Sequence, residues 1–289
     1  MMRNMPISPR EVLRKHSFAT KHSLGQHFLF DEDLLAHLVE LAGITAEDDV
    51  LEIGPGSGTL TRQLAAHARR VLAVEIDRDL LSILAETLAD CPNVTVIHSD
   101  ILHTDVAPLF AGRFKALANL PYYLTTELLT RLLTAKLPMD TLAVMVQAEV
   151  GDKMIAEPGA PEYGPLAVLC RYFADTRKAL RVPAGRFSPP PKVDSVFMRL
   201  DIRAQPPVVC EDEALLLRVI RCAFAMRRKT LLNNLRAGFG LDKAGALDCV
   251  GAAGLSTDIR GERMCLADFA AIATALIKMQ VSKSIPSKT

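Results

Sequence analysis

Four residues near the middle of the chain could hold a planar ring that carries an amino group. Asn119-Leu120-Pro121-Tyr122 follows the apolar run Phe114 to Ala118, which is typical of a buried strand. An amide and nearby backbone carbonyls accept hydrogen bonds from an amine, and an aromatic side chain can stack beneath the ring. The tetrapeptide therefore predicts a site for a nucleobase with an exocyclic amine, although a strand followed by a proline turn would have the same pattern.

A glycine-rich loop lies upstream, after another apolar run. In Glu52-Ile53-Gly54-Pro55-Gly56-Ser57-Gly58 the glycines would let the backbone approach a ligand closely, between a strand and a helix that begins near Thr59. A dinucleotide site would use the spacing G-x-G-x-x-G, and here the third glycine comes one residue early, which disfavours an NAD-dependent oxidoreductase. The acidic residue before the loop suits a ligand that carries a positive sulfonium.

Two further acidic residues follow the next two apolar runs. Glu75 comes twenty-one residues after Gly54, where a carboxylate can accept both hydroxyls of a ribose. Asp100 follows the third run, where a carboxylate can accept from the amine of an adenine ring. Either residue alone could instead be a helix N-cap. With the glycine loop and Asn119, however, they would lie at four strand ends, and together they predict S-adenosylmethionine as the cofactor.

The elements that must position these residues can be read from the alternation of short apolar runs with helical patterns between about Asp49 and Gln147. The expected strands are 50–53, 71–74, 94–97, 114–118 and 142–146. Short strands that are buried on both faces indicate an α/β fold with a doubly wound, mainly parallel sheet covered by helices. Ligands of such sheets bind beyond the carboxyl ends of the strands, where the strand order reverses.

The pattern changes after the last of these strands. Two more strand-like segments, Lys178 to Val182 and Val193 to Ile202, flank a proline cluster and predict an edge hairpin. From Asp212 onward only helical spacing of apolar residues remains, which predicts a smaller, all-helical C-terminal domain.

Composition limits the class of protein. The 289 residues are 49% hydrophobic, enough for a large core and about two domains. No apolar stretch reaches the roughly 18 residues of a membrane span, and no secretory signal is evident, so we expect a cytoplasmic protein. The six cysteines form no C-x-x-C pair and show no ligand spacing with the histidines, which favours reduced thiols and no metal.

Charge is distributed unevenly along the chain. The net charge is only +1, but residues 1–30 carry a net +4 and residues 177–236 a net +8, so the remainder is acidic. Two basic segments in an otherwise acidic chain predict a local footprint for a polyanion such as RNA. The alternative is that they are ordinary solvated faces.

Taken together, these motifs resemble the small-subunit ribosomal RNA adenine dimethyltransferases. That family is related to the large-subunit methyltransferases that confer macrolide resistance and to mitochondrial transcription factor B. The similarity runs from Lys21–Leu29 to the helical tail and includes the glycine loop, Asn119–Tyr122, Phe187–Ser195 and Arg227–Thr230. It implies a Rossmann-like class I methyltransferase that transfers methyl groups from S-adenosylmethionine. The implied acceptors are the exocyclic amines of two adjacent adenosines in the 3′-terminal hairpin of 16S rRNA, during small-subunit assembly.

The resemblance also implies roles for single residues. The methyl donor would be bound by His27, Leu29, Gly54, Gly56, Glu75, Asp100 and Asn119, and the catalytic site would consist of Asn119, Leu120, Tyr122 and Phe187. Tyr122 and Phe187 would clamp the target adenine. Apart from the resemblance, we expect Tyr123 to pack in the core, with an exchange of roles between the two tyrosines as the alternative. RNA would be bound by Arg221, Arg227, Arg228 and Lys229, together with Arg218. The family usually has asparagine at the position of His27.

The expected organisation is a basic N-terminal extension (1–24), a methyltransferase domain (25–204), a helical RNA-binding domain (209–280) and a flexible tail (281–289). The expected partner is small-subunit rRNA or the immature subunit, and the expected oligomeric state is a monomer. Three alternatives remain at this point. They are a large-subunit (23S) rRNA methyltransferase, a non-catalytic assembly or transcription factor, and, least favoured, an NAD-dependent oxidoreductase.

Overall fold

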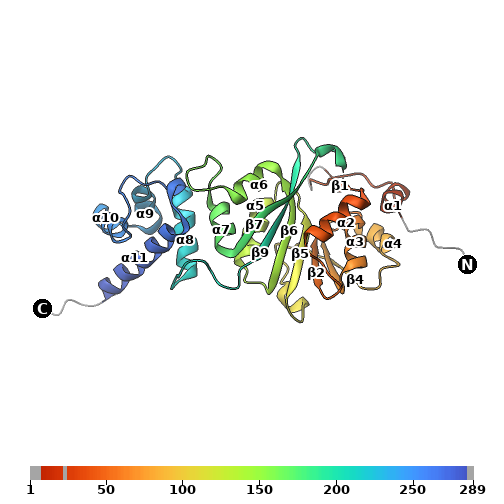
Figure 1. The fold of residues 1–289 in the computed structure, drawn as a ribbon, viewed down its shortest axis with the longest axis horizontal. Coiled ribbons are helices and arrows are strands. Elements are labelled where there is room, and N and C mark those ends of the chain that lie inside the picture. Colours follow the sequence, from red (N-terminus) through yellow and green to blue (C-terminus); the bar gives the residue numbers. More distant parts are fainter. Residues whose placement is uncertain (1–7, 22–24, 285–289) are drawn as a thin grey trace, which may run out of the picture. The chain divides into compact units, whose positions relative to one another are not determined.

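A computed structural model describes residues 8–21 and 25–284 (Figure 1). The expectations for residues 1–7, 22–24 and 285–289 lie outside these described residues. The chain divides into two compact units. The sheet unit is Met1–Gly151 with Asp175–Ile202, and the helical unit is Asp152–Ala174 with Arg203–Thr289.

The sheet unit is built on seven strands in the order β4-β3-β2-β5-β6-β9-β7 (Figure 1). Their bounds are β2 Asp49–Ile53, β3 Arg70–Glu75, β4 Val94–His98, β5 Phe114–Asn119, β6 Met139–Gln147, β7 Ala174–Val182 and β9 Ser195–Ile202. The first five strands of this order are parallel, and β9 pairs with β6 antiparallel. The predicted doubly wound, mainly parallel sheet is therefore confirmed. The strand order reverses between β2 and β5, which carry the two strongest sequence motifs at their carboxyl ends.

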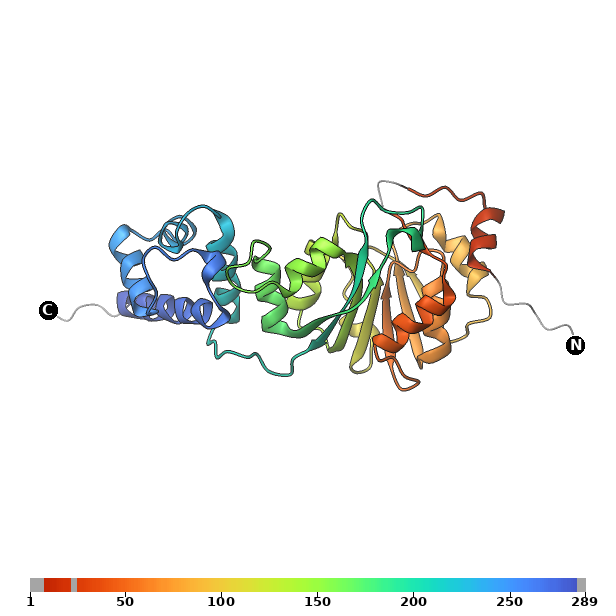
Figure 2. The ribbon, with the colours of Figure 1, turned by 45° about the horizontal axis from the view of Figure 1, so that its top comes forward.

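Helices connect and cover these strands (Figure 2). The strand order runs in opposite directions on the two sides of β2 and β5, and because such crossovers are right-handed as a rule, α3 (Thr59–His67) and α4 (Leu80–Thr87) cover one face of the sheet and α5 (Thr125–Thr134) covers the other. On the first face α2 (Glu32–Leu41) packs against α3, and α1 (Pro9–Lys15) packs against α4. The connection from β4 to β5 contains the short helix η2 (Ala107–Leu109), and α6 (Ala148–Ile155) follows β6.

A second, two-stranded sheet was not predicted. β1 (Phe28–Leu29) pairs antiparallel with β8 (Phe187–Ser188), which follows the short helix η3 (Ala184–Arg186). Strands of two residues are too short to show a hydrophobic period, so the sequence contains no signal for this pairing. The small sheet attaches the segment before α2 to a loop that is distant in the sequence.

The helical unit contains α7 (Pro165–Phe173), α8 (Glu213–Ala225), α9 (Leu231–Phe239), α10 (Lys243–Ala252), η4 (Gly261–Arg263) and α11 (Leu266–Ser284). From Asp212 to Ser284 the structure has no strand, as predicted. The domain boundary differs from the expectation at residues 152–174. Tyr163, Val168 and Tyr172 share one hydrophobic cluster with residues of α8 and α11, so this segment packs in the helical unit. The expected tail also begins later than residue 281, because α11 continues to Ser284.

Two general properties concern the part of the chain that the structure describes. None of its helices combines the length and apolar content that a membrane span requires. All six cysteines are free thiols, three of them buried.

Candidate active site

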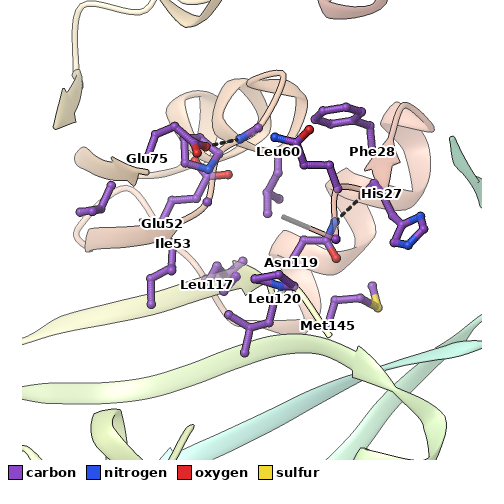
Figure 3. Close-up of a pocket in the computed structure, with 18 of the residues that line it drawn as sticks. His27, Phe28, Glu52, Ile53, Leu60, Glu75, Leu117, Asn119, Leu120 and Met145 are labelled. Carbon is purple, nitrogen blue, oxygen red and sulfur yellow. Dashed lines mark hydrogen bonds between the residues drawn. The ribbon is translucent and has the colours of Figure 1, made fainter. Parts of the chain in front are cut away.

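A pocket opens at the carboxyl ends of β2, β3 and β5 in the sheet unit (Figure 3). Its empty volume is about 1290 Å³, including the space open to solvent. The pocket brings together most of the residues that the sequence analysis singled out, namely His27, Leu29, Gly54, Gly56, Glu75, Asp100, Asn119, Leu120 and Tyr122. It lies at the reversal of the strand order, where an open α/β sheet binds its ligands.

The glycine loop forms one side of the pocket and has backbone angles that favour glycine. Gly54 has φ +70° and Gly56 has φ +59°. A Cβ atom on Gly56 would come within 3.0 Å of the Phe28 ring. The Gly56 amide donates a hydrogen bond to Oε2 of Glu75 at 3.1 Å. The loop is thus held against the end of β3, with its backbone exposed to a ligand.

Glu75 lies at the end of β3, where two backbone amides hold its carboxylate. Its side chain is buried, and burial raises its pKa above the ordinary value. Oε1 accepts a hydrogen bond from the Asp77 amide at 2.8 Å, and Oε2 accepts the bond from Gly56. Each carboxylate oxygen has a second lone pair, so both can also accept from ligand hydroxyls.

Glu52 is a site residue that is missing from the predicted set, although its position before the loop suits a cationic ligand. The residue is 1% exposed, lines the pocket, and has no hydrogen-bond partner for Oε2 among the described residues. Burial and the nearby Glu75 raise the pKa of Glu52 to about 8. A buried carboxyl oxygen without a partner is unfavourable, and a cationic ligand would compensate for it. This orphaned oxygen therefore fits a donor with a positive sulfonium and ammonium.

Asp100 lies at the edge of the same pocket and is partly engaged in its own turn. Oδ1 accepts from the Leu102 amide at 2.9 Å, and Oδ2 lies 2.9 Å from Nδ1 of His103. These contacts fix the orientation of the carboxylate. An adenine amine would have to use the lone pairs that these bonds leave open.

The side chain of Asn119 has a defined orientation because its amide nitrogen already donates a hydrogen bond. Nδ2 donates to the carbonyl of His27 at 3.0 Å, and only the NH₂ group can donate to a carbonyl. Oδ1 is therefore the atom that remains to accept from a ligand. The next peptide is also fixed, because the Leu120 amide donates to the carbonyl of Met145 at 3.2 Å.

Tyr122 is held at both its hydroxyl and its ring. The hydroxyl lies 2.8 Å from Oγ of Ser195, and burial raises the pKa of the phenol, so it stays neutral. The ring stacks on His27, with centroids 5.4 Å apart and planes at 30°. Nδ1 of His27 in turn donates to the carbonyl of Pro189 at 2.7 Å. The His27 ring thus supports Tyr122 and points away from Glu52 and Glu75 (Figure 3).

Two predicted aromatic positions differ from the structure. Phe187 is 4% exposed, lies opposite Leu29 in the small sheet, and packs in a hydrophobic cluster with residues of α2, so it does not line the pocket. Tyr123, expected in the core, is 58% exposed and does line the pocket. The unpredicted pairing of β1 with β8 accounts for the burial of Phe187. The ring that stacks on Tyr122 in the described structure is therefore His27 and not Phe187.

The predicted RNA-binding residues lie in the helical unit. Arg221 is exposed on α8, and Arg227, Arg228 and Lys229 are exposed in the turn before α9. Arg218 differs, because its guanidinium carbon lies over the Phe239 ring, 4.3 Å from the ring centroid. Within residues 8–21 and 25–284, no cluster of three or more His, Cys, Asp or Glu side chains could hold a metal ion.

Comparison with known proteins agrees with this geometry. Residues 17–262 match the family described as "Ribosomal RNA adenine dimethylase". Two relatives named "Ribosomal RNA small subunit methyltransferase A", from Geobacillus thermodenitrificans and Bacillus mycoides, are 42% and 43% identical to the chain. The alignments cover 95% and 96% of this chain and 97% and 98% of the relatives.

Solved structures share the fold. A dimethyladenosine transferase from Plasmodium falciparum has a TM-score of 0.72 at 23% identity, covering 88% of this chain and 98% of its own. The 23S rRNA methyltransferase ErmE has a TM-score of 0.65 at 26% identity, covering 86% of this chain and 99% of its own. On the family match and the near full-length identity, the chain belongs to the ribosomal RNA adenine dimethylase family.

Proposed function

We propose that this protein uses S-adenosylmethionine to dimethylate the exocyclic amines of two adjacent adenosines in the 3′-terminal hairpin of 16S rRNA. One observation carries the proposal. A single pocket joins the glycine loop and Glu75 to Asn119-Leu120-Pro121-Tyr122, so a methyl donor and an adenine amine could meet in it. The two named relatives, matched along nearly their whole length, support small-subunit rRNA as the substrate.

The donor would be bound between Glu52, the glycine loop, Glu75 and Asp100. S-adenosylmethionine, when bound, supplies an activated methyl group on a positive sulfur. Glu52 would face the cationic end of the donor, because its Oε2 is buried and has no partner in the described structure. Glu75 would accept the ribose hydroxyls, as its buried carboxylate already accepts two backbone amides.

The adenine amine would be held by fixed acceptors. Its nitrogen is a weak nucleophile because the lone pair is delocalised into the ring. Oδ1 of Asn119 and the carbonyl of Leu120 would accept its two hydrogens and favour the geometry needed for attack. The Asn119 amide is held by its hydrogen bond to His27, and the peptide before the Leu120 carbonyl is held by the bond from the Leu120 amide to Met145, so little reorganisation is needed during the reaction.

The target base must leave its stack before it can react. Extrusion costs a few kcal/mol, and stacking on one aromatic ring returns about 1–3 kcal/mol. His27 stacks on one face of the Tyr122 ring, and the base would use the other face. Phosphate contacts would add to this stacking energy, and the exposed Arg221, Arg227, Arg228 and Lys229 could provide them.

The same proposal extends to the partner, the oligomeric state and the compartment. The partner would be the immature small subunit, since an accessible 3′-terminal hairpin is needed. The protein would act as a monomer, because one chain contains the whole pocket. It would work in the cytoplasm, where ribosomes are assembled.

A large-subunit methyltransferase is the competing function, because ErmE shares the fold at 26% identity. The two functions can be distinguished directly by finding which rRNA is methylated. Purified protein and labelled donor are incubated with immature small and large ribosomal subunits, and methylated nucleotides are mapped by mass spectrometry. We expect dimethyladenosine at two adjacent positions near the 3′ end of 16S rRNA. Methylation of 23S rRNA alone would contradict the proposal.

A further inference from the structure

A second recess lies beside helix α1 in the sheet unit. It is lined by Arg10 and Arg14 of α1, by Phe18, Phe28 and Phe30, and by Pro189. Its empty volume is about 630 Å³, including the space open to solvent. These six residues are called the arginine–phenylalanine recess below.

The charge of the recess is not compensated within the described part of the protein. Arg10 and Arg14 are exposed and one helical turn apart, where like charges repel and destabilise a helix. Neither forms an ion pair with another described residue, whereas the following Lys15 and His16 both contact Glu86, at 2.7 and 3.0 Å. Two adjacent guanidinium groups without a carboxylate favour binding of an anion, and phosphate suits their geometry.

The phenylalanines add a flat apolar surface to these charges. Phe18 and Phe30 are half-buried, and each ring centroid lies 6.1 Å from that of Phe28. The guanidinium carbon of Arg10 lies 5.5 Å from the centroid of the Phe30 ring. Guanidinium groups beside aromatic rings are the chemistry that binds single-stranded nucleic acid, through phosphates and stacked bases.

The recess and the donor pocket share one lining residue. Phe28 lines both the recess and the donor pocket, and Figure 3 shows it on the same side of that pocket as His27. Pro189 accepts the hydrogen bond from His27, whose ring stacks on Tyr122. An RNA strand with one base on Tyr122 would therefore pass the recess within a short distance.

We propose that the arginine–phenylalanine recess binds a nucleotide of the substrate RNA that flanks the target adenosine. Arg10 and Arg14 hold its phosphate, and its base packs against Phe18 and Phe30. The inference rests on the proposed function, since it takes RNA as the substrate. It gives the strand an anchor beside the extruded base, which neither Tyr122 nor the helical unit supplies.

The test compares the variant R10A/R14A with R131A, which removes an exposed arginine of α5 that also forms no ion pair among the described residues. The probe is a hairpin RNA that carries two adjacent adenosines and their flanking strand. In R10A/R14A we expect the KM for this RNA to rise about tenfold, with an unchanged affinity for S-adenosylmethionine. The slope of log affinity against log salt should fall by about 0.7 for each phosphate that the variant no longer neutralises. R131A should behave as wild type.

Two additional readouts keep the outcomes distinct. R10K/R14K retains the charge and should retain the salt dependence. With 4-thiouridine next to the target adenosine, ultraviolet crosslinking should map to the peptides that contain Phe18 or Phe30. An active wild type with an unchanged KM and salt slope in R10A/R14A would overturn the inference alone, as would a loss of donor affinity in that variant. A wild type that methylates no rRNA would instead contradict the proposed function.

Discussion

The raised pKa of Glu52 should make donor binding sensitive to pH. Its pKa is raised to about 8, so the free protein holds it protonated at neutral pH. A cationic donor favours the carboxylate, so binding releases a proton. We expect the affinity for S-adenosylmethionine to rise by up to about tenfold per pH unit from about pH 6 and to level off above about pH 8. Calorimetric titration at several pH values measures this slope.

The matched variant is Glu52→Gln, which cannot titrate and should remove the slope. An equal slope in both proteins would contradict the assignment. The folding stability depends on pH in the opposite direction to the donor affinity. The folded pKa of about 8 exceeds the ordinary value of 4.5, so unfolding releases a proton between these values. The stability of free wild-type protein relative to Glu52→Gln should therefore fall as pH rises from about 4.5 to about 8.

Substitutions of Tyr122 and Glu75 should distinguish the base-binding half of the pocket from the donor-binding half. Tyr122→Ala removes the stacking surface for the base, and we expect kcat to fall about 100-fold or more with donor affinity within about twofold of wild type. Glu75→Ala should weaken donor binding by about tenfold or more, because it removes a charge-assisted acceptor. Tyr122→Phe keeps the ring and removes only the hydroxyl that bonds to Ser195, so it should keep most activity. The reverse pattern of effects would refute this division.

Among the elements, the end of β3 is connected to the segment before β1 through Asp77. Lys21 Nζ lies 2.6 Å from the carboxylate of Asp77, Gln26 Nε2 donates to it at 2.8 Å, and the Asp77 amide donates to Glu75. Asp77→Ala should raise the KM for both donor and RNA severalfold, because the segment also carries His27. Asp79→Ala removes only an exposed ion pair with Lys21 and should have little effect. Equal kinetics of the two variants would exclude this role.

The turn between α8 and α9 is held by a buried side chain. Asn234 is 1% exposed, donates to the carbonyl of Ala223 at 3.1 Å and accepts from the amide of Met226 at 3.0 Å. Asn234→Ala should destabilise the protein by about 2–3 kcal/mol and weaken RNA binding, because the basic turn loses its support. Asn233→Ala, which removes an exposed hydrogen bond with Thr230, should cost less than about 0.5 kcal/mol. Urea denaturation and filter binding compare the two.

The predictability of each element follows from the length of its pattern. The parallel strands are evident in the sequence because short apolar runs alternate there with helical patterns, and the strand order places Glu75 and Asn119 at one edge. The two-residue β1 and β8 carry no such signal, so the burial of Phe187 could not be foreseen. The expectation that Tyr123 packs in the core is wrong because two adjacent tyrosines do not reveal which one faces outward.

At the scale of the whole molecule, domain membership is harder to predict than secondary structure. Residues 152–174 follow the last parallel strand directly, so the sequence favours their assignment to the sheet unit. The side chains that decide their membership, such as Tyr163 and Val168, contact residues far along the chain. Amphipathic spacing shows that a helix has an apolar face and does not show which core that face joins.

The net charge of +1 likewise conceals where RNA would bind. The exposed Arg227, Arg228 and Lys229 belong to the helical unit, and Arg10 and Arg14 belong to the sheet unit. Each unit therefore has a basic surface of its own, and removal of either set should reduce the salt dependence of RNA binding separately.

The most direct test of the central claim is a crystal structure with sinefungin, a stable analogue of the methyl donor, and adenosine monophosphate. We expect the analogue between Glu52, the glycine loop and Glu75, and the adenine on the free face of Tyr122 with its amine at Oδ1 of Asn119. An adenine bound away from Asn119, or an analogue whose reactive amine faces away from the base, would contradict the proposed chemistry.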